Sequence, residues 1–365
     1  MKKVLFIIPS LAGGGAERQA VTVARLLVTK GYNVSFVCYS KEDFYYSLLN
    51  ESGIRVFINE CNYFKRVLFV VRTIHSGHYK AVISFLPTPN FLNCLASFIN
   101  KKWQTIISER SSDESVFHIR RDRFYSWFYR KADAIVCNSD NARSLWIKYY
   151  PNYTNRLLTI YNTVSLGKID TAYIPRKCGR LNIVVAATVY ELKNPMGLVN
   201  AVRLMSREER DLLHVFWYGK KEAMIGDHAE YDRVKYAIED EHLEDVITLH
   251  DATRDIADRM YEADCVALFS KIEGMPNAIC EGMMLGKPII MTRVSDYSTI
   301  VEDGVNGFLC DWDNPNSIKN ALLSMSSIDN ERLVQMGANS KDKAEVLFSE
   351  ESIINKWIAI IDAQR

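Results

Sequence analysis

The sequence predicts an α/β protein with two successive doubly wound domains that face each other across a cleft. Three observations support this prediction. Short apolar runs rich in β-branched and aromatic residues alternate with amphipathic helical patterns. The alternation stops near residue 170 and then restarts. The chain has 365 residues, whereas a single hydrophobic core stops growing at about 250–300 residues.

The first series of elements opens with a βαβ unit. A buried strand is expected at Val4–Pro9, a glycine loop at Gly13–Gly15 and a helix at Ala16–Lys30, which Gly31 terminates. A second strand is expected at Asn33–Tyr39, which completes a βαβ unit. The sheet of such a unit is parallel, and its crossover is almost always right-handed. Further strands are expected at Ala81–Leu86, Gln104–Ser108 and Ala134–Asn138.

The second series has the same alternation. A hinge is expected between the two series at Lys168–Arg180, which contains Pro175 and Gly179. The predicted domains are therefore residues 1–170 and 171–350, followed by a C-terminal helix within residues 351–365. We expect this helix, Ser352–Ile361, to pack on the first domain through its apolar face. Strands are expected at Leu181–Ala187, Leu213–Tyr218, Val246–Leu249, Cys265–Phe269 and Pro288–Met291.

The charge of the chain is divided unevenly. The whole sequence carries 45 Lys+Arg and 44 Asp+Glu, a net of +1. Residues 1–170 carry 23 Lys+Arg and 12 Asp+Glu, a net of +11. Residues 171–365 carry 22 Lys+Arg and 32 Asp+Glu, a net of −10. An asymmetry of this size predicts that the two domains meet different ligands.

The composition also bears on the compartment and on metal binding. The eight cysteines lie in apolar surroundings, without a C-x-x-C motif or a histidine at metal-ligand spacing. The apolar run in MKKVLFIIPS is too short for a signal peptide, and no run approaches the roughly 20 residues that span a bilayer. We expect a reduced, cytoplasmic protein without a metal, whose membrane contact is peripheral.

The glycine loop after the first strand is one candidate ligand site. Glycines let the backbone approach a phosphate, and a helix N-terminus attracts anions. A tight turn without a ligand explains Gly13–Gly15 equally well. A nicotinamide cofactor is disfavoured, because the third glycine of G-x-G-x-x-G is missing and Glu42 and Asp43 lie beyond the second strand.

The most informative stretch is residues 270–286, SKIEGMPNAICEGMMLG. A strand leads into a loop that holds Glu273 and Gly274, and a helix that carries Glu281 begins near Asn277. The free N–H groups at the start of this helix suit a diphosphate. Each carboxylate alone could be a solvated surface charge. Together they would repel an anion unless they accept hydrogen bonds from hydroxyls, which sugars and riboses supply.

With this stretch, the sequence resembles the retaining glycosyltransferases of family 4, which have the two-domain, Rossmann-like GT-B fold. The resemblance covers nearly the whole chain, and members with Gly-Met-Pro-Asn look most like transferases that build bacterial surface polysaccharides such as O-antigen or capsule. The matching segments are GGGAER, KADAIVCNSDNAR, IYNTV, ELKNPMGLVNA, EGMPNAICEGMMLGKPII and IVEDGVNGFL.

The resemblance implies a role for each matching residue. Glu273 would lie beside the donor sugar, Glu281 would hold the ribose hydroxyls and Lys193 would neutralise the diphosphate. The catalytic set would be Glu273, Lys193 and Glu109. The donor-binding set would be Gly14, Gly15, Thr188, Lys193, Glu273, Gly274, Met275, Asn277, Ala278, Ile279 and Glu281.

Two positions depart from the family pattern. Thr188 stands where the family usually has an arginine, which leaves Lys193 as the cation of this motif. Glu109 and Arg110 follow a middle strand of the first domain, where many members place a histidine. Glu109 would then be the polar contact, and Arg110 could supply the missing positive charge. His118 is a second candidate, although an ordinary surface histidine explains it better.

A basic and aromatic segment, Phe117–Lys131, predicts the acceptor or membrane side of the first domain. On a helix its aromatic residues share one face with arginines along the margins, as interfacial helices do on anionic membranes. Packing of the aromatics in the core is the alternative. A second such patch is Tyr63–Phe69, and no nucleic-acid-binding motif is present. The residues assigned to this side are Arg110, His118, Arg120, Arg121, Arg123 and Trp127.

We therefore expect a metal-independent hexosyltransferase without a cofactor, peripherally bound to the inner face of the cytoplasmic membrane. The donor would be a nucleotide-diphosphate sugar, UDP-linked as the first choice and GDP-mannose as the second. The acceptor would be a lipid-linked saccharide bound by the first domain. Two alternatives keep the fold: a nucleotide-sugar epimerase or phosphorylase, and a non-catalytic scaffold that binds nucleotide sugars.

Overall fold

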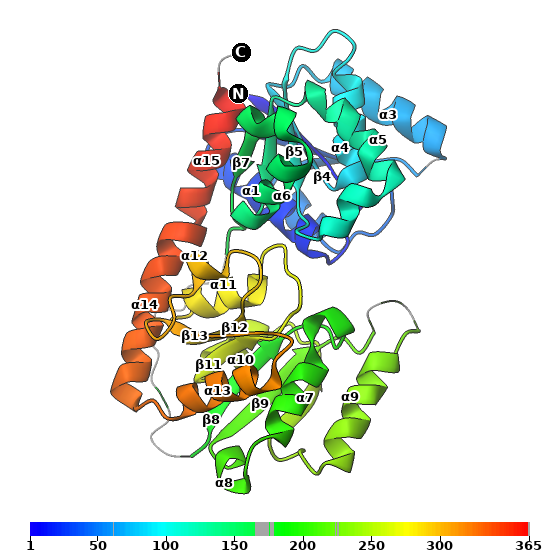
Figure 1. Ribbon diagram of the computed structural model, residues 1–365. Coiled ribbons are helices and arrows are strands. Elements are labelled where there is room, and N and C mark those ends of the chain that lie inside the picture. The colour runs from blue at the N-terminus through cyan, green and yellow to red at the C-terminus, as the bar shows by residue number, and fades with distance from the viewer. Residues whose placement is uncertain (61, 165–174, 176–178, 223, 225, 364–365) are drawn as a thin grey trace. The chain divides into compact units, whose positions relative to one another are not determined.

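The computed structural model describes residues 1–60, 62–164, 175, 179–222, 224 and 226–363. These residues form two compact units, Met1–Ser165 with Ser349–Arg365, and Leu166–Phe348 (Figure 1). Most of the predicted hinge at residues 168–180, the predicted boundary at residue 170, and Cys61 and Cys178 lie outside the described residues. No helix within the described residues is long and apolar enough to cross a membrane.

The first unit contains a seven-stranded parallel sheet in the order β3-β2-β1-β4-β5-β6-β7. The order reverses between β1 and β4, which is the topological switch point where doubly wound folds bind ligands. The strands are β1 (Lys3–Ile7), β2 (Asn33–Cys38), β3 (Arg55–Ile58), β4 (Ala81–Phe85), β5 (Gln104–Glu109), β6 (Ala134–Cys137) and β7 (Leu157–Thr159).

Alternation along β1 divides the core of this unit between the two faces of the sheet. Leu5 and Ile7 join one core cluster with apolar residues of the helices α3 to α6. On the opposite face, Phe6 stacks on Phe85, which in turn stacks on Trp357 of α15 at 6.1 Å. The helices are α1 (Gly15–Thr29), α2 (Tyr46–Glu51), α3 (Tyr63–Ser76), α4 (Pro87–Ala96), α5 (Arg120–Phe128), α6 (Asp140–Tyr149) and α15 (Glu350–Asp362).

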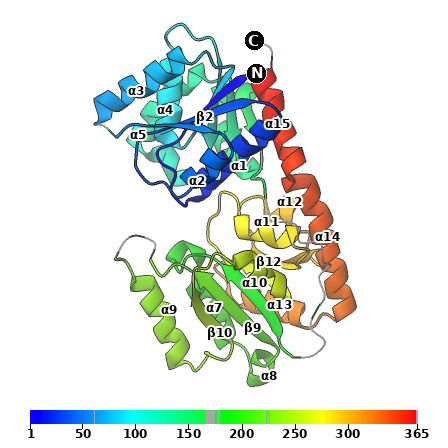
Figure 2. The same ribbon diagram turned by 180° about the vertical axis from the view of Figure 1, so that it is seen from behind.

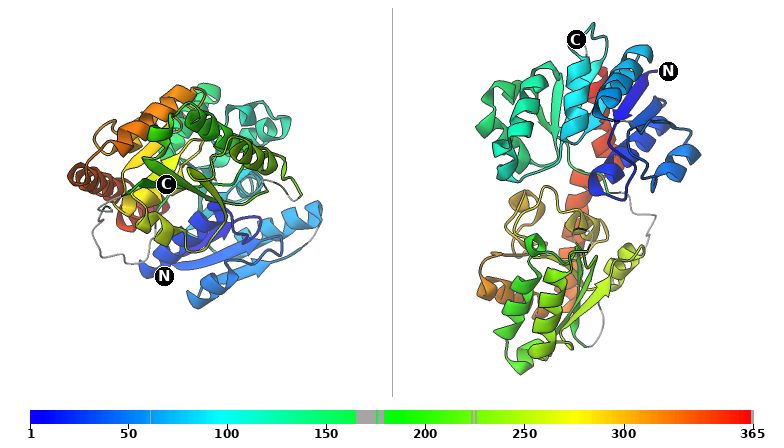
Figure 3. Two further views of the ribbon diagram at one scale, coloured as in Figure 1. Left: turned by 90° about the horizontal axis from the view of Figure 1, so that it is seen from below. Right: turned by 90° about the vertical axis from the view of Figure 1, so that its right-hand side faces the viewer.

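The C-terminal helix α15 belongs to the first unit. It lies beside α1 (Figure 2), and its buried residues include Ile353, Ile354, Trp357 and Ile361. Lys2 forms an ion pair with Asp362 at 2.6 Å. Residues at the start of β1 and at the end of α15 are therefore neighbours in this unit, in which both elements can be followed by their blue and red colours in Figure 3.

The second unit contains a six-stranded parallel sheet in the order β10-β9-β8-β11-β12-β13, with its switch point between β8 and β11. The strands are β8 (Leu181–Ala186), β9 (Leu213–Gly219), β10 (Ile247–Asp251), β11 (Cys265–Leu268), β12 (Ile289–Thr292) and β13 (Gly307–Cys310). The helices are α7 (Pro195–Arg203), α8 (Arg207–Arg210), α9 (Ala229–Asp240), α10 (Ile256–Glu262), α11 (Asn277–Met284), α12 (Tyr297–Ile300), α13 (Pro315–Ser326) and α14 (Asn330–Phe348).

The predicted fold class is confirmed, because each unit holds a doubly wound parallel sheet. The predicted strands are present with ends that differ by one or two residues. Strands β3, β7 and β13 were not predicted. They are three or four residues long and lie at sheet edges, where partial exposure blurs the apolar pattern.

Candidate functional site

In the second unit, the loops after β8 and β11 meet at the switch point. The Lys193 Nζ lies 2.5 Å from the Glu273 Oε1. The same oxygen accepts a hydrogen bond from the Ser270 hydroxyl at 2.7 Å. The Glu273 side chain is 11% exposed, so one lysine and one serine orient a largely desolvated carboxylate. A carboxylate held in this way has oxygen lone pairs left for further donors.

A second set of contacts joins the same two loops. The Lys271 Nζ lies 2.9 Å from the Glu191 Oε1, and the Lys271 N–H donates to the Leu192 carbonyl at 2.8 Å. Asn194 adopts a left-handed conformation with φ of 58°, and its side chain donates to the Trp312 carbonyl at 2.8 Å. These contacts fix the backbone on both sides of Lys193.

Helix α11 begins four residues after Glu273, and the Asn277 N–H donates to the Met275 carbonyl at 2.9 Å. The N–H groups of Ala278 and Ile279 follow in the first turn, where a helix directs N–H groups toward acceptors outside itself. Its N-cap is Pro276, no side chain of the described residues caps it, and its first turn holds no acidic residue. Gly282 allows the helix to approach β11, since a Cβ there would lie 2.8 Å from the Val266 Cβ. This helix end is therefore uncapped and positively polarised.

The other predicted donor residues lie along the same loops and helix. Glu281, Thr188, Asn277, Ala278 and Gly274 are half-buried. Met275 and Ile279 are buried in the protein, so only their backbone groups remain for a ligand.

Thr188 lies near the end of β8 on the segment that leads to Lys193. The preceding carbonyl, that of Ala187, accepts a hydrogen bond from the Trp217 indole at 2.7 Å. Lys271 is a second cation in these loops, and sequence reasoning missed it because its partner Glu191 comes from a distant segment.

In the first unit, the glycine loop precedes α1, whose N-cap is Gly14. The carboxylates of Glu17 and Glu42 lie close to this loop. A Cβ on Gly14 would lie 2.3 Å from a carboxylate oxygen of Glu17, and Glu42 accepts a hydrogen bond from the Ser10 hydroxyl at 2.7 Å. Burial, with the nearby Glu42 charge, raises the pKa of Glu17.

The residue Gln19 joins this loop to the IYNTV segment. Its side chain donates to the Thr163 carbonyl at 2.9 Å and accepts from the Thr163 N–H at 3.0 Å. Gln19 is buried, so this double contact fixes the start of α1 against the segment that follows β7. Sequence reasoning did not single out this residue, although it directly follows the GGGAER motif.

Glu109 is the last residue of β5 and lies in a polar network that continues into the core. Its Oε1 accepts a hydrogen bond from the Asn90 side chain at 2.8 Å, and the Asn90 Oδ1 accepts from the Ser84 hydroxyl at 2.8 Å. Burial raises the pKa of the Glu109 carboxyl to about 7, although hydrogen bonds with Asn90 and Tyr129 act to lower it. This carboxyl therefore titrates near neutral pH.

Arg110 lies beside Glu109 and points toward the IYNTV segment. Its guanidinium donates to the Asn162 side chain and lies 5.3 Å from the centre of the Phe85 ring. Burial lowers the pKa of Arg110 to about 10, so the group keeps its charge at neutral pH. The neighbouring Leu86 has a φ of 77°, a strained conformation of the kind found at functional sites.

An apolar cavity of about 150 Å³ opens beside Glu109. Aromatic side chains form much of its wall, which suits the apolar faces of sugar rings. Its lining is Leu86, Pro87, Glu109, Arg110, Ser111, Val116, Phe117, Asp122, Tyr129, Trp146 and Tyr150. Sequence reasoning missed Asn90 and Asn162, which orient Glu109 and Arg110 in this wall.

The other residues predicted for the acceptor or membrane side lie outside this cavity wall. His118 is exposed, with its Nε2 3.4 Å from the Tyr149 hydroxyl. On α5, Trp127 is 51% exposed and Tyr125 is buried, and Tyr129, which directly follows the helix, is also buried. The aromatic residues of this segment are thus divided between the core and the surface. Arg120, Arg121 and Arg123 are exposed.

Among the described residues, no group of three or more His, Cys, Asp or Glu side chains is placed to hold a metal ion. The described cysteines, among them Cys38 and Cys94, are buried and free. Burial raises the pKa of the Cys38 thiol to about 12.

Two family models match the chain. The model described as Glycosyltransferase Family 4 matches residues 13–168. The model described as Glycosyl transferases group 1 matches residues 180–327. The first match contains the glycine loop and the Glu109 cavity, and the second contains Lys193, Glu273 and α11.

Curated relatives match at low identity over nearly the full length. A Campylobacter jejuni protein is 22% identical over 375 residues, covering 99% of this chain and 98% of that protein. It is named as a GalNAc-α-(1→4)-GalNAc-α-(1→3)-diNAcBac-PP-undecaprenol α-1,4-N-acetyl-D-galactosaminyltransferase. The amylovoran biosynthesis glycosyltransferase AmsD of Erwinia amylovora is 22% identical and covers 99% of this chain and 100% of that protein.

A solved structure shares the whole fold. HepE of Anabaena, crystallised with UDP and glucose, superimposes with a TM-score of 0.84 at 19% identity, covering 100% of both chains. At this identity the likeness concerns the fold, which is the GT-B fold that the sequence predicted.

Proposed function

Because the chain belongs to the family 4 glycosyltransferases, we propose that it transfers a sugar from a nucleotide diphosphate to a lipid-linked saccharide, with retention of the anomeric configuration. The predicted family and enzyme class are confirmed. The proposed process is the assembly of a bacterial cell-surface polysaccharide, in line with the names of the Campylobacter and Erwinia relatives.

One observation carries the proposal: the Lys193–Glu273 pair at the switch point, beside the uncapped start of α11. The diphosphate of the donor would compete with Glu273 for the Lys193 ammonium and accept hydrogen bonds from the N–H groups of Ala278 and Ile279. Glu273 would then accept hydrogen bonds from the sugar hydroxyls. Glu281, further along α11, would hold the ribose.

The chemistry requires positive charge where the leaving diphosphate becomes more negative. We propose that Lys193 and the α11 N-terminus supply this charge, without a metal or a cofactor. The acceptor hydroxyl would attack from the side of the leaving group and give its proton to a donor phosphate oxygen. This route requires no enzymic nucleophile and gives retention.

We propose a UDP-sugar as donor and GDP-mannose as the second choice. The UDP bound to HepE, which has the same fold, supports this order. For the acceptor, we propose the cavity beside Glu109, with the aromatic wall against the sugar ring and the Glu109 carboxyl on a hydroxyl. The lipid diphosphate in the Campylobacter relative's acceptor supports a lipid-linked substrate.

We further propose that the first unit associates peripherally with the inner face of the cytoplasmic membrane. This unit carries 24 Lys+Arg against 14 Asp+Glu, a net of +10. Two basic surfaces are available for this contact, one around Arg120, Arg121 and Arg123 and one at the other end of α5. An anionic lipid surface attracts such a charge.

The proposal is tested with the purified chain, a panel of nucleotide sugars and a lipid-linked acceptor. Glu273→Gln should lower transfer by about 10²–10³-fold, the usual cost of losing one electrostatic stabiliser of a transition state. Its thermal unfolding should stay within a few degrees of the wild type. Undiminished transfer by a folded Glu273→Gln variant would sink the assignment.

The same assay separates the alternatives. A transferase releases free nucleotide diphosphate only when acceptor is present, whereas an epimerase changes the donor without acceptor and without release. A phosphorylase requires inorganic phosphate. Binding of donor without turnover over any acceptor identifies a scaffold. The anomeric configuration of the product, read by NMR, decides between retention and inversion.

A further inference from the structure

A second, larger cavity lies at the opposite edge of the first sheet from Glu109. It has a volume of about 720 Å³ and opens where β5 and β6 begin, because Gln104 is the first residue of β5 and Asp133 directly precedes β6. Glu109 ends the same strand β5, five residues further on, which places the two cavities about 17 Å apart along the strand. The lining is Ser97, Phe98, Asn100, Lys101, Gln104, Arg130, Lys131, Ala132, Asp133, Arg156 and Ala363.

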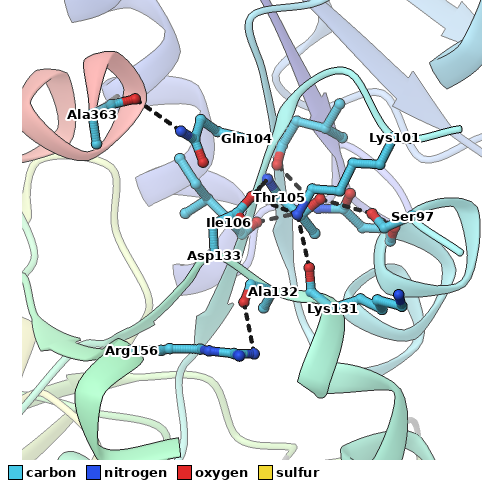
Figure 4. A network of polar contacts seen from close by, with 12 residues as sticks. Ser97, Lys101, Gln104, Thr105, Ile106, Lys131, Ala132, Asp133, Arg156 and Ala363 are labelled. Atoms are coloured by element: carbon cyan, nitrogen blue, oxygen red, sulfur yellow. Dashed lines mark hydrogen bonds and ion pairs between the residues drawn. The ribbon is translucent and has the colours of Figure 1, made fainter. Parts of the chain in front are cut away.

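Among the residues that the structure describes, the lining contains four cations and one carboxylate. The carboxylate is already satisfied: the Asp133 Oδ2 lies 2.6 Å from the Lys101 Nζ and accepts from the Thr105 N–H at 2.7 Å (Figure 4). Lys101 also donates to the Lys131 carbonyl at 3.0 Å (Figure 4). One lysine is therefore neutralised by Asp133, and three positive charges remain in the wall.

Those three cations contact neutral groups. Arg156 donates to the carbonyls of Arg130 at 2.6 Å and Ala132 at 3.2 Å, and Figure 4 shows its side chain lying along this wall. The Arg130 guanidinium lies 3.5 Å from the centre of the Trp127 ring. The Lys131 ammonium lies 4.8 Å from the centre of the Phe98 ring. Carbonyls and rings orient a cation without cancelling its charge.

The rim of the cavity is apolar and exposed. Trp127 is 51% exposed, Phe98 37% and Ile99 63%. The rings of Phe98 and Trp127 are stacked with centroids 6.0 Å apart. Exposed tryptophan and phenylalanine beside arginine and lysine are typical of segments that enter the boundary between lipid headgroups and acyl chains.

We propose that this cavity, which we call the Arg130 cavity, binds the phosphates of an anionic phospholipid bilayer, while Phe98, Ile99 and Trp127 enter the lipid interface. Charge complementarity selects this occupant, because three uncancelled cations line a space large enough for a headgroup and apolar side chains border it. The inference rests on the proposed peripheral association and names the surface that makes it. That surface is the C-terminal end of α5, not the arginines at its start.

The test measures binding of the full chain to sedimented vesicles of phosphatidylcholine with 30% phosphatidylglycerol. Arg130→Gln/Lys131→Gln should weaken binding about thirtyfold, since each cation near an anionic surface is worth about 1 kcal/mol. Ile99→Ser/Trp127→Ala removes the apolar rim without changing charge and should also weaken binding at least tenfold. Phosphatidylcholine vesicles alone should bind weakly.

The matched control is Arg120→Gln/Arg123→Gln, which removes the same charge from exposed positions at the start of α5. It should keep binding to within about threefold of the wild type. The inference is overturned if this control loses binding while Arg130→Gln/Lys131→Gln keeps it. A second outcome also overturns it: vesicles do not bind, but 10 mM inorganic phosphate raises the thermal stability of the wild type and not that of Arg130→Gln/Lys131→Gln. The cavity is then a site for small anions.

A parallel assay with a water-soluble acceptor analogue keeps the two proposals separate. Normal transfer without vesicle binding contradicts the membrane inference and leaves the enzymatic function standing. Vesicle binding without transfer to any acceptor contradicts the function alone. Unchanged circular dichroism and urea midpoints show that the variants are folded.

Discussion

The environment of the Glu109 carboxyl in the first unit brings its titration to neutral pH. Asn90 and Tyr129 hydrogen-bond it, and burial raises its pKa to about 7. In the unfolded chain the carboxyl has the ordinary pKa of about 4.3. Folding therefore takes up a proton between about pH 4.5 and 7, and the stabilisation present at low pH is lost as the pH rises through 7.

Glu109→Gln should remove this pH dependence. From pH 5 to pH 8 the wild type should lose up to about 3 kcal/mol of unfolding free energy more than the variant does. The measurement is urea denaturation of both proteins at several pH values. If the unfolding free energies of the two proteins changed with pH in the same way, the raised pKa of Glu109 would be contradicted.

The two loop lysines of the second unit provide a matched pair. Lys193 contacts Glu273 and Lys271 contacts Glu191, in both cases within 3 Å. Lys193→Gln should lower kcat/KM about 10²–10³-fold, because it removes charge from the leaving group. Lys271→Gln should lower it less than tenfold, since it loses a contact between loops. Steady-state kinetics measure kcat/KM for both variants. An equal decrease in kcat/KM would argue against a special role for Lys193.

Sequence reasoning found single residues but not their partners. Glu109, Lys193 and Glu273 stand in motifs that can be read along the chain. Asn90 and Ser270 could not be found in the same way, because their roles depend on atoms that the fold brings together: Asn90 reaches Glu109 of β5 from helix α4, and Ser270 shares its acceptor oxygen with Lys193 from a distant loop. A contact between distant segments leaves no spacing in the sequence.

At the scale of the elements, the position of α11 on β11 depends on Gly282. A Cβ there would lie 2.8 Å from the Val266 side chain, so the helix would have to move away from the strand. The end of α11 that we propose for the diphosphate would move with it. The packing of one glycine is thus coupled to the geometry of the donor site.

Gly282→Ala should destabilise the protein by about 1–3 kcal/mol, as overpacking does, and weaken donor binding. Val266→Ala makes room for the added methyl, so Gly282→Ala/Val266→Ala should be more stable than the sum of the single changes predicts. Urea denaturation of the four proteins measures this coupling. If the changes in unfolding free energy were strictly additive, the added methyl at residue 282 would not contact Val266.

Sequence patterns are sufficient to find the buried strands but not the exposed or very short ones. Strands such as β1 and β4 are buried throughout most of their length, and a run of apolar residues between turns reveals them. β3 has no buried residue and β7 has only three residues, so hydrogen bonding to a neighbour defines them. α5 presents aromatic residues both to the core and to solvent, which periodicity alone could not assign.

At the scale of the whole molecule, charge is distributed by unit. The first unit has a net charge of +10, and the second, with 21 Lys+Arg and 30 Asp+Glu, has −9. A negative unit can bind an anionic donor only through local groups, here Lys193 and the start of α11. In the membrane contact that we propose, the field of the positive unit would contribute as well.

The two interactions should therefore respond differently to salt. Between 50 and 500 mM NaCl, binding to anionic vesicles should fall at least tenfold, because charges separated by more than about 10 Å are screened at 0.1 M. The dissociation constant of the donor should change less than threefold. Vesicle sedimentation and calorimetric titration test this, and a steep salt dependence of donor binding would contradict the local explanation.

The place of α15 has a consequence for how the protein is made. The strands of the first sheet lie within residues 1–165, but Trp357, which stacks on Phe85, follows the second unit in the sequence. Because a ribosome synthesises a chain from its N-terminus, α15 emerges only after the second unit. Until then, part of one apolar face of the first sheet stays uncovered. The first unit is thus completed only after the second has been made, and the nascent chain offers chaperones an apolar surface until α15 is in place.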